Sequence, residues 1–504
     1  MQLSLAQIAE MIASSVPVSP ETMVAGYSID SRTIRPRELF FAVKGQRLDG
    51  HAFVSEVLGA GAAGAVVAAS SRGNFPAALQ SKLLAVPDPL AALQALAAGV
   101  RRRWGGPVVA ITGSTGKTTT KQIIASLLRT NFRVLENAGN LNNQFGLPLS
   151  LLRLESETEI GVFEMGMSGP GEIRLLANIA EPHVAVVTNV SAAHLQFFPN
   201  VQAIARAKFE LMEALGPGDW AVLNTDDPRV ASFGVHCRSH VLYFGLGDSA
   251  DLRADELLPS TDGGYSFRVH LPVRGEIRPA SAWKDQPAVA PLTSSPSDVR
   301  FHLPLIGRHN VSNVLAALGV AYLFGIKPAS LAEAVSRLEP ASQRGELVRL
   351  ANGVRIVNDC YNSNPGALEA MLGAVAEIPA GRRYAVLGGM RELGPTSEQL
   401  HYRCGRRVVE LGFAGLITVG DEARPLAAGA LAAGIPDAAV MHCATPEEAG
   451  ERLREMFEPG DVVLLKASRA VQLEKIWDRL GPRADVAPEE VAAGAGSRRR
   501  REGT

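Results

Sequence analysis

Residues 111–119, ITGSTGKTT, combine two glycines, a lysine and several hydroxyl groups in a pattern that suits phosphate binding. An apolar run at residues 107–110 precedes them and a helical pattern at residues 121–128 follows. The N–H groups of such a loop can surround an anion, and the helix adds the positive end of its dipole. Lys117 can reach the β- and γ-phosphates of ATP or GTP, and the Thr118 hydroxyl suits Mg²⁺. The residues that we expect to bind the nucleotide here are Gly113, Ser114, Thr115, Gly116, Lys117, Thr118 and Thr119.

This loop is shorter than the common G-x-x-x-x-G-K-[ST] pattern, because Ile111 stands where the first glycine of that pattern would fall. A Gly/Ser/Thr turn without a ligand is the alternative interpretation. Lys117 and the two flanking elements favour phosphate binding.

Two further polar residues follow apolar runs of the same region, and a lysine begins a helical pattern nearby. Glu164 comes directly after a predicted strand at residues 160–163, and His194 follows another at residues 184–187. Ligands of open α/β sheets gather at such strand ends, where a carboxylate and an imidazole could hold Mg²⁺ or Mn²⁺. Lys208 begins a helical pattern, for which a solvent-exposed lysine is the simplest interpretation.

Alternating strand and helix patterns predict an α/β protein of three domains. We expect a small N-terminal α/β module over residues 1–104, a central phosphate-loop domain with a parallel sheet over residues 105–325, and a C-terminal Rossmann-like domain over residues 326–485. A Pro/Ser/Ala-rich stretch predicts a flexible insertion at about residues 275–300, and we expect the arginine-rich residues 486–504 to be disordered.

Composition excludes several classes of protein. The 504 residues carry a formal net charge of −1 and 46% are hydrophobic, which argues against a nucleic-acid-binding protein and against general disorder. Four scattered cysteines, without C-x-x-C spacing, are typical of ordinary thiols. Without a signal-peptide pattern or an apolar run of membrane-spanning length, we expect a cytoplasmic protein that is not embedded in a membrane. We also expect a monomer.

A series of motifs extends this interpretation. The elements G-S-T-G-K-T (113–118), N-L-N-N (140–143), E-M-G (164–166), N-V-S-A-A-H (189–194) and A-K (207–208) recur in this order in Mur ligases, and the chain resembles that family. The similarity continues through G-R-H-N-V-S-N (307–313), Arg344, D-C-Y-N-S-N-P (359–365), L-G-G-M-R-E-L-G (387–394) and K-A-S-R (466–469). It covers about residues 28–478.

The resemblance implies a reaction. The D-x-Y-N-x-N-P and M-x-E-L-G elements are similar to those of the member that adds D-alanyl-D-alanine to UDP-N-acetylmuramoyl-tripeptide. The D-Y-A-H and D-N-P-R patterns of the member that adds the third amino acid are missing at the matching places. The implied chemistry is an ATP-dependent ligation through an acyl phosphate, which yields the UDP-muramoyl-pentapeptide of peptidoglycan synthesis.

The resemblance also implies roles for individual residues. Asn140 and Asn143 would face the muramoyl group, His309 and Asn310 the adenine, Arg344 the γ-phosphate, and Asp359 the ribose. Thr118, Glu164 and His194 would hold Mg²⁺, and Lys208, carbamylated by CO₂, would hold a second Mg²⁺. The remaining substrate-binding residues implied are Ser31, Arg32, Lys44, Asp49 and His51 for the uridine nucleotide, and Tyr361, Asn364, Lys466, Ser468 and Arg469 in the third domain, which would close over ATP.

Three positions depart from the family pattern, and alternative functions remain open beside the resemblance. Gly389 stands where the family commonly has Asp, Arg391 where it has an apolar residue, and Phe209 where it has a small one. The alternatives are a ligase for the third amino acid, a folylpolyglutamate synthase, a phosphate-loop ATPase that serves as a switch or motor, and a binding protein with a decayed ATP site.

Overall fold

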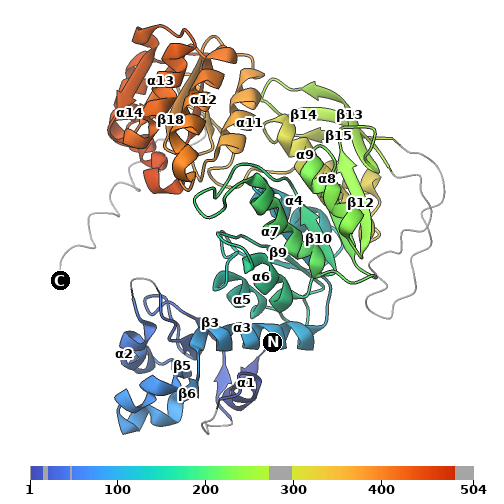
Figure 1. Ribbon diagram of the computed structural model, residues 1–504, viewed down its shortest axis with the longest axis vertical. Coiled ribbons are helices and arrows are strands. Elements are labelled where there is room, and N and C mark those ends of the chain that lie inside the picture. Colours follow the sequence, from blue (N-terminus) through green and yellow to red (C-terminus); the bar gives the residue numbers. More distant parts are fainter. Residues whose placement is uncertain (1, 15–20, 46–47, 272–297, 483–504) are drawn as a thin grey trace.

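The structure is a computed structural model that describes residues 2–14, 21–45, 48–271 and 298–482 (Figure 1). Three large sheets follow one another along the chain and along the longest axis of the molecule. The predicted three-domain α/β fold class is therefore confirmed, whereas the exact boundaries at residues 104, 325 and 485 stay predictions. Residues 275–297 of the predicted insertion and the predicted disordered tail, residues 486–504, lie outside the described residues. No described helix is both long and apolar enough to cross a bilayer.

A four-stranded parallel sheet, in the order β3-β4-β5-β6, forms the N-terminal unit. These strands are Gly26–Ser28, Glu38–Phe41, Gly64–Ala68 and Leu83–Val86, and the shorter pair is β1 (Leu3–Ser4) with β2 (Met23–Val24). The helices are α1 (Leu5–Met11), α2 (Val54–Gly59) and α3 (Pro89–Trp104). The Asp88 carboxylate caps α3 by accepting a hydrogen bond from the Leu90 N–H at 2.8 Å. Buried residues of α3 share one hydrophobic core with β7 and α6 of the next unit, so α3 joins the two.

The central sheet has nine strands in the order β15-β14-β13-β12-β11-β10-β7-β9-β8, of which β14 and β15 are antiparallel additions. The strands are β7 (Val108–Thr112), β8 (Val134–Glu136), β9 (Ile160–Glu164), β10 (Val184–Val187), β11 (Trp220–Asn224), β12 (His240–Gly245), β13 (Leu252–Pro259), β14 (Tyr265–His270) and β15 (Val299–Leu303). The helices are α4 (Lys117–Leu128), α5 (Gly146–Leu151), α6 (Glu172–Ala180), α7 (Val201–Glu213), α8 (Pro228–Phe233), α9 (Arg308–Leu323) and α10 (Ala332–Ser336).

Helices cover both faces of this sheet, which explains the continuous apolar runs of its strands. Successive residues of a strand point to opposite faces, so Val109 and Ile111 of β7 join the core formed with α4 and α9, whereas Val108 and Ala110 join the core formed with α6 and α7. Every residue of β7, β9, β10 and β11 is buried. The sheet is therefore a rigid support for the loops at its carboxyl edge.

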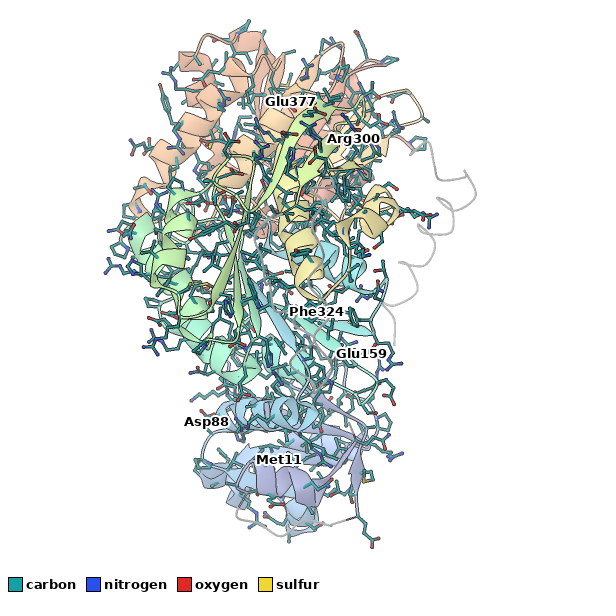
Figure 2. All side chains as sticks on the ribbon, turned by 90° about the vertical axis from the view of Figure 1, so that its right-hand side faces the viewer. Met11, Asp88, Glu159, Arg300, Phe324 and Glu377 are labelled. Carbon is teal, nitrogen blue, oxygen red and sulfur yellow. The ribbon has the colours of Figure 1, made fainter. Side chains whose placement is uncertain are left out.

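The C-terminal sheet has six strands in the order β16-β17-β21-β18-β19-β20, all parallel to their neighbours except β16. The strands are β16 (Glu346–Arg349), β17 (Arg355–Asn358), β18 (Arg383–Gly388), β19 (Gly415–Val419), β20 (Val440–Cys443) and β21 (Val462–Lys466). The helices are α11 (Pro365–Ala376), α12 (Ser397–Glu410), α13 (Arg424–Ala432) and α14 (Pro446–Met456). Tyr265 of β14 donates a hydrogen bond to Glu377, which Figure 2 shows at the junction of this domain with the central sheet.

His183 makes the joint between α3 and the central sheet sensitive to pH. Its Nδ1 accepts a hydrogen bond from the Val108 N–H at 3.3 Å and lies 3.4 Å from the Arg101 guanidinium. Burial and then the Arg101 charge lower the pKa of His183 from 6.5 to about 4. The folded chain thus binds fewer protons than the unfolded chain between these values.

We expect the contribution of His183 to the free energy of unfolding to be complete above pH 6.5 and to be lost as the pH falls towards 4, with an upper limit of about 3 kcal/mol. Urea unfolding at pH 7 and pH 5 measures it. The His183→Gln variant should lose less stability than the wild type over this interval, whereas His302→Gln, at an exposed position of β15, should behave as the wild type. Equal losses in all three proteins would contradict the assignment.

Candidate active site

A cleft of about 700 Å³ lies where the carboxyl edges of the central and C-terminal sheets face each other. The central sheet contributes residues at or after the ends of β7, β9, β10 and β11, and the C-terminal sheet contributes residues after β17 and β18 and at the end of β21. The predicted site residues that line this cleft are Ser114, Thr115, Gly116, Lys117, Thr118, Thr119, Asn140, Asn143, Glu164, His194, His309, Asn310, Arg344, Asp359, Tyr361, Asn364, Lys466, Ser468 and Arg469.

The phosphate loop requires glycine at two places. Gly113 has a φ of +155° and Gly116 a φ of +79°, and a Cβ on Gly113 would lie 1.9 Å from Thr188 Oγ1. Gly116 directly precedes α4, whose first residue is Lys117. The Lys117 ammonium donates a hydrogen bond to the Gly113 carbonyl at 2.9 Å, so it bends back over the loop. This geometry places a cation and the N-terminus of a helix at one point of the cleft.

The loop after β10 braces the phosphate loop. Asn189 Oδ1 accepts hydrogen bonds from both the N–H and the hydroxyl of Thr115 at 3.0 Å, and the Ser114 N–H donates to the Asn189 carbonyl at 2.9 Å. The Thr188 hydroxyl donates to the Thr115 carbonyl at 2.6 Å. Residues more than 70 positions apart in the chain thereby hold the loop in one conformation.

Glu164 is a buried carboxylate at the end of β9, with 2% of its surface exposed. It accepts hydrogen bonds from the Thr118 hydroxyl and from the Asn142 amide, each at 2.7 Å. The Asn137 side chain bonds to both backbone groups of Glu164. Its Oδ1 accepts from the Glu164 N–H at 2.9 Å, and its Nδ2 donates to the Glu164 carbonyl at 3.2 Å. A fixed carboxylate beside a hydroxyl is an oxygen donor set that suits a small hard cation such as Mg²⁺.

His194 connects the two halves of the cleft. Its Nδ1 lies 2.5 Å from a carboxylate oxygen of Glu392, a residue of the C-terminal domain, and the Gln196 N–H donates to the Glu392 carbonyl at 3.0 Å. His194 also has a positive φ of 59°, which is uncommon for a non-glycine residue. Among the described residues, no group of three His, Cys, Asp or Glu side chains is arranged to hold a metal. Thr118 and Glu164 therefore fit Mg²⁺ as a pair that ligand oxygens and water would have to complete.

Lys208 differs from the solvent-exposed lysine at a helix start that its local sequence suggested. The helix begins earlier, at Val201, because the Asn200 side chain caps it, and Lys208 lies in its middle with 2% of its surface exposed. Burial, and next the charge of Lys117, lower the pKa of Lys208 well below its ordinary value. Within the described residues its amine makes no hydrogen bond or ion pair, and Lys208 is not among the residues that line the cleft.

The start of α9 faces the cleft from the central domain. The His309 side chain lies here, and burial lowers its pKa from 6.5 to about 4, although the Asp359 charge acts in the opposite direction. Asn310 donates to the Ile306 carbonyl and accepts from Asn313, both at 2.8 Å. Asn313 also accepts from the Thr120 hydroxyl at 3.1 Å, so α9 and α4 are joined beside the phosphate loop.

The C-terminal domain presents several charged and polar groups. Lys466 donates to the Asp359 carboxylate and to the Asn362 carbonyl, the latter at 3.0 Å. The Arg344 guanidinium stacks on Tyr361, 4.2 Å from the ring centre. Asn364 caps α11, because its Oδ1 accepts a hydrogen bond from the Ala367 N–H at 2.9 Å.

The other predicted site residues do not line the cleft. Gly113 and Lys208 do not line it, and the first-domain residues Ser31, Arg32, Lys44, Asp49 and His51 belong to the N-terminal unit. Arg32 pairs with Asp30 and lowers the pKa of that carboxyl to about 2. His51 Nδ1 contacts Asp49 at 2.6 Å, and its Nε2 accepts from the Ala68 N–H at 2.9 Å. These contacts form a second polar surface, distant from the phosphate loop (Figure 1).

Sequence reasoning missed several residues that organise the cleft. Asn142, Asn189 and Glu392 stand inside the quoted motifs but were not selected, although each contacts a selected residue. Asn313 also stands inside a quoted motif, at the end of G-R-H-N-V-S-N (307–313), and contacts Thr120. Asn137 carries no local signal, because only its tertiary contact with Glu164 gives it a role.

Comparisons with known proteins agree with this geometry. Family models match at three places: "Mur ligase family, catalytic domain" at residues 23–101, "Mur ligase middle domain" at residues 111–321, and "Mur ligase, glutamate ligase domain" at residues 343–469. A UDP-N-acetylmuramoyl-tripeptide–D-alanyl-D-alanine ligase of Bacillus subtilis is 33% identical over 472 residues, which cover 93% of this chain and 96% of that protein.

Solved structures agree as well. A crystal structure of MurF from Acinetobacter baumannii matches with a TM-score of 0.82 and 27% identity, over 95% of this chain and 99% of the other. MurF of Thermotoga maritima, solved in complex with ADP, matches with a TM-score of 0.76 and 29% identity, over 90% of this chain and 96% of the other. The chain belongs to the Mur ligase family. It is therefore an ATP-dependent ligase, and the resemblance found in its motifs is confirmed.

Proposed function

We propose that this chain joins D-alanyl-D-alanine to UDP-N-acetylmuramoyl-tripeptide, with ATP converted to ADP and phosphate. The product is the UDP-muramoyl-pentapeptide used in peptidoglycan synthesis. The observation that carries the proposal is the cleft between two carboxyl sheet edges, where a phosphate loop faces Arg344, Asp359 and Lys466 of another domain. The near full-length relatives of this name support the choice of substrates.

The reaction requires activation of a carboxylate. A peptide carboxylate is a poor acylating agent, so its oxygen first attacks the γ-phosphorus of ATP and ADP departs, leaving an acyl phosphate. The amine of the dipeptide then attacks the acyl carbon, the phosphate departs with the bonding electron pair, and the amine loses a proton. Two domains that meet at the cleft exclude the water that would hydrolyse the acyl phosphate.

The residues at the cleft supply positioning and charge. Lys117 and the N–H groups of the phosphate loop hold the phosphates of ATP, and Arg344 neutralises charge on the transferred group. His309, Asn310 and Asp359 hold the nucleoside part of ATP. Thr118 and Glu164, with His194 at the domain contact, would hold Mg²⁺, which offsets the negative charge of the phosphates when bound.

Peptide and sugar parts of the substrate need further groups. Asn140 and Asn143 face the muramoyl group, and Ser31, Arg32, Lys44, Asp49 and His51 bind the uridine nucleotide on the N-terminal unit. The elongated arrangement of the three units supports this division, since a nucleotide-linked glycopeptide is itself long (Figure 1).

Lys208 belongs to the site as a carbamate. Burial, and next the charge of Lys117, lower the pKa of this amine and so favour its uncharged form, which can add to CO₂. The carbamate would be an anion within the electrostatic influence of Lys117, able to hold a second Mg²⁺ through oxygen.

Phosphate release tests the function directly. The protein is incubated with ATP and Mg²⁺ and with UDP-muramoyl-tripeptide, D-alanyl-D-alanine, or both. Released phosphate is quantified, and the masses of the products are measured by mass spectrometry. We expect phosphate and a pentapeptide mass only with both substrates. Phosphate release at the same rate with and without the two substrates would favour an ATPase switch. Ligation of a different amine would overturn the substrate assignment.

A further inference from the structure

Five lysine and arginine side chains line the cleft within the described part of the chain, and four of them contact groups of the cleft wall or of its surroundings. Lys117 binds the Gly113 carbonyl, and Lys466 pairs with Asp359. Arg344 stacks on Tyr361, and Arg469 pairs with Glu474 at 2.7 Å. Arg391 is the fifth.

The backbone around Arg391 is held at three points. The Met390 N–H donates to His401 Nε2 at 2.8 Å, the Arg391 N–H donates to the Ser468 hydroxyl oxygen at 2.9 Å, and the Ser468 N–H donates to the Gly389 carbonyl at 3.1 Å. The next residue, Glu392, contacts His194 of the central domain. Arg391 is therefore presented by a rigid loop beside the contact between the two domains.

The Arg391 side chain is more than half exposed and has one partner among the described residues. Its Nη1 lies 2.7 Å from Glu422 Oε1. Glu422 packs over Gly389, where a Cβ would lie 2.8 Å from the Cβ of Glu422, so the missing side chain makes room for this carboxylate. A guanidinium has five N–H donors in a planar fork, and the contact at Nη1 leaves the Nε and Nη2 edge open for a bidentate carboxylate.

We propose that Arg391 binds the terminal carboxylate of the acceptor dipeptide. The inference rests on the proposed function, in which the acceptor amine must reach the acyl phosphate inside this cleft. The opposite end of the dipeptide is an anion, and it needs a cation that the phosphates of ATP do not occupy. Arg391 meets that need from the C-terminal domain, and Glu422 holds its guanidinium in place.

An acceptor without the carboxylate isolates this contact. The specificity constant kcat/KM is measured for D-alanyl-D-alanine and for its C-terminal amide, in the wild type and in Arg391→Met. We expect the wild type to prefer the free acid by about tenfold to a hundredfold, because a bidentate charge-assisted contact is worth that ratio. Arg391→Met should lose this preference, with the amide rate within about twofold of the wild type and the KM for ATP unchanged.

Two further variants make the result specific. Arg391→Lys keeps the charge without the fork and should retain part of the preference. Arg403→Met removes an exposed arginine of α12 that pairs with Glu369 outside the cleft, and should keep all of it. An unchanged acid-to-amide ratio in Arg391→Met, or a raised KM for UDP-muramoyl-tripeptide instead, would overturn the inference. A wild type that ligates neither dipeptide would overturn the proposed function itself.

Discussion

Replacing Lys117 with alanine is expected to lower ATP-dependent pentapeptide synthesis by about a thousandfold. The ammonium lies over the phosphate loop, bonded to the Gly113 carbonyl at 2.9 Å, and its field acts where charge develops on the transferred phosphoryl group. Water cannot replace it well, because burial is the largest influence on this amine and lowers its pKa. Phosphate release under saturating substrates measures the loss.

A control separates this effect from unfolding. Lys117 makes one hydrogen bond that the braced loop can lose, since Asn189 and Thr188 also hold Thr115. Urea unfolding of Lys117→Ala should therefore match the wild type to within about 1 kcal/mol. Lys475→Ala, at an exposed position of the C-terminal domain, should retain full activity. Activity of Lys117→Ala within tenfold of the wild type would contradict the role.

Local sequence patterns were sufficient for the phosphate loop and for the buried strands. The glycine positions and Lys117 follow from a contiguous motif, and the helix predicted over residues 121–128 begins four residues earlier, at Lys117. Apolar runs predicted β7, β9 and β10 because both faces of these strands are covered. Strands β16 and β20 were not predicted. Both lie at sheet edges and bury only one residue each, so their sequences lack an apolar run.

The parts of the cleft that sequence patterns could not predict depend on distant contacts. His194 and Glu392 are 198 residues apart, and nothing near either residue indicates that they meet. The burial of Lys208 is another case, because the charged neighbours Arg206 and Glu210 suggest a solvated helix face. The motif series indicated that Lys208 matters, and packing around α7 explains how a lysine can be uncharged there.

Removal of the Lys208 amine is expected to reduce ligation by about a hundredfold or more without weakening the fold. Burying a polar amine is itself costly, whichever form it takes, so the free energy of unfolding of Lys208→Ala should change less than for an ordinary core truncation. If the active form is a carbamate, the lost group is an anion that small carboxylic acids can imitate in the vacated space. We therefore expect acetate or formate to restore part of the ligation rate of Lys208→Ala.

Lys208→Arg provides the matched control, because a guanidinium stays protonated and does not add to CO₂. Short acids should not restore its activity, since the arginine side chain still fills the space. In the wild type, incubation with ¹³C-labelled bicarbonate should give a carbamate carbon signal that both variants lack. Wild-type activity in Lys208→Ala would refute any role of the amine. A wild type without the carbamate signal, combined with a variant that acids do not rescue, would instead leave the uncharged amine itself as the functional group.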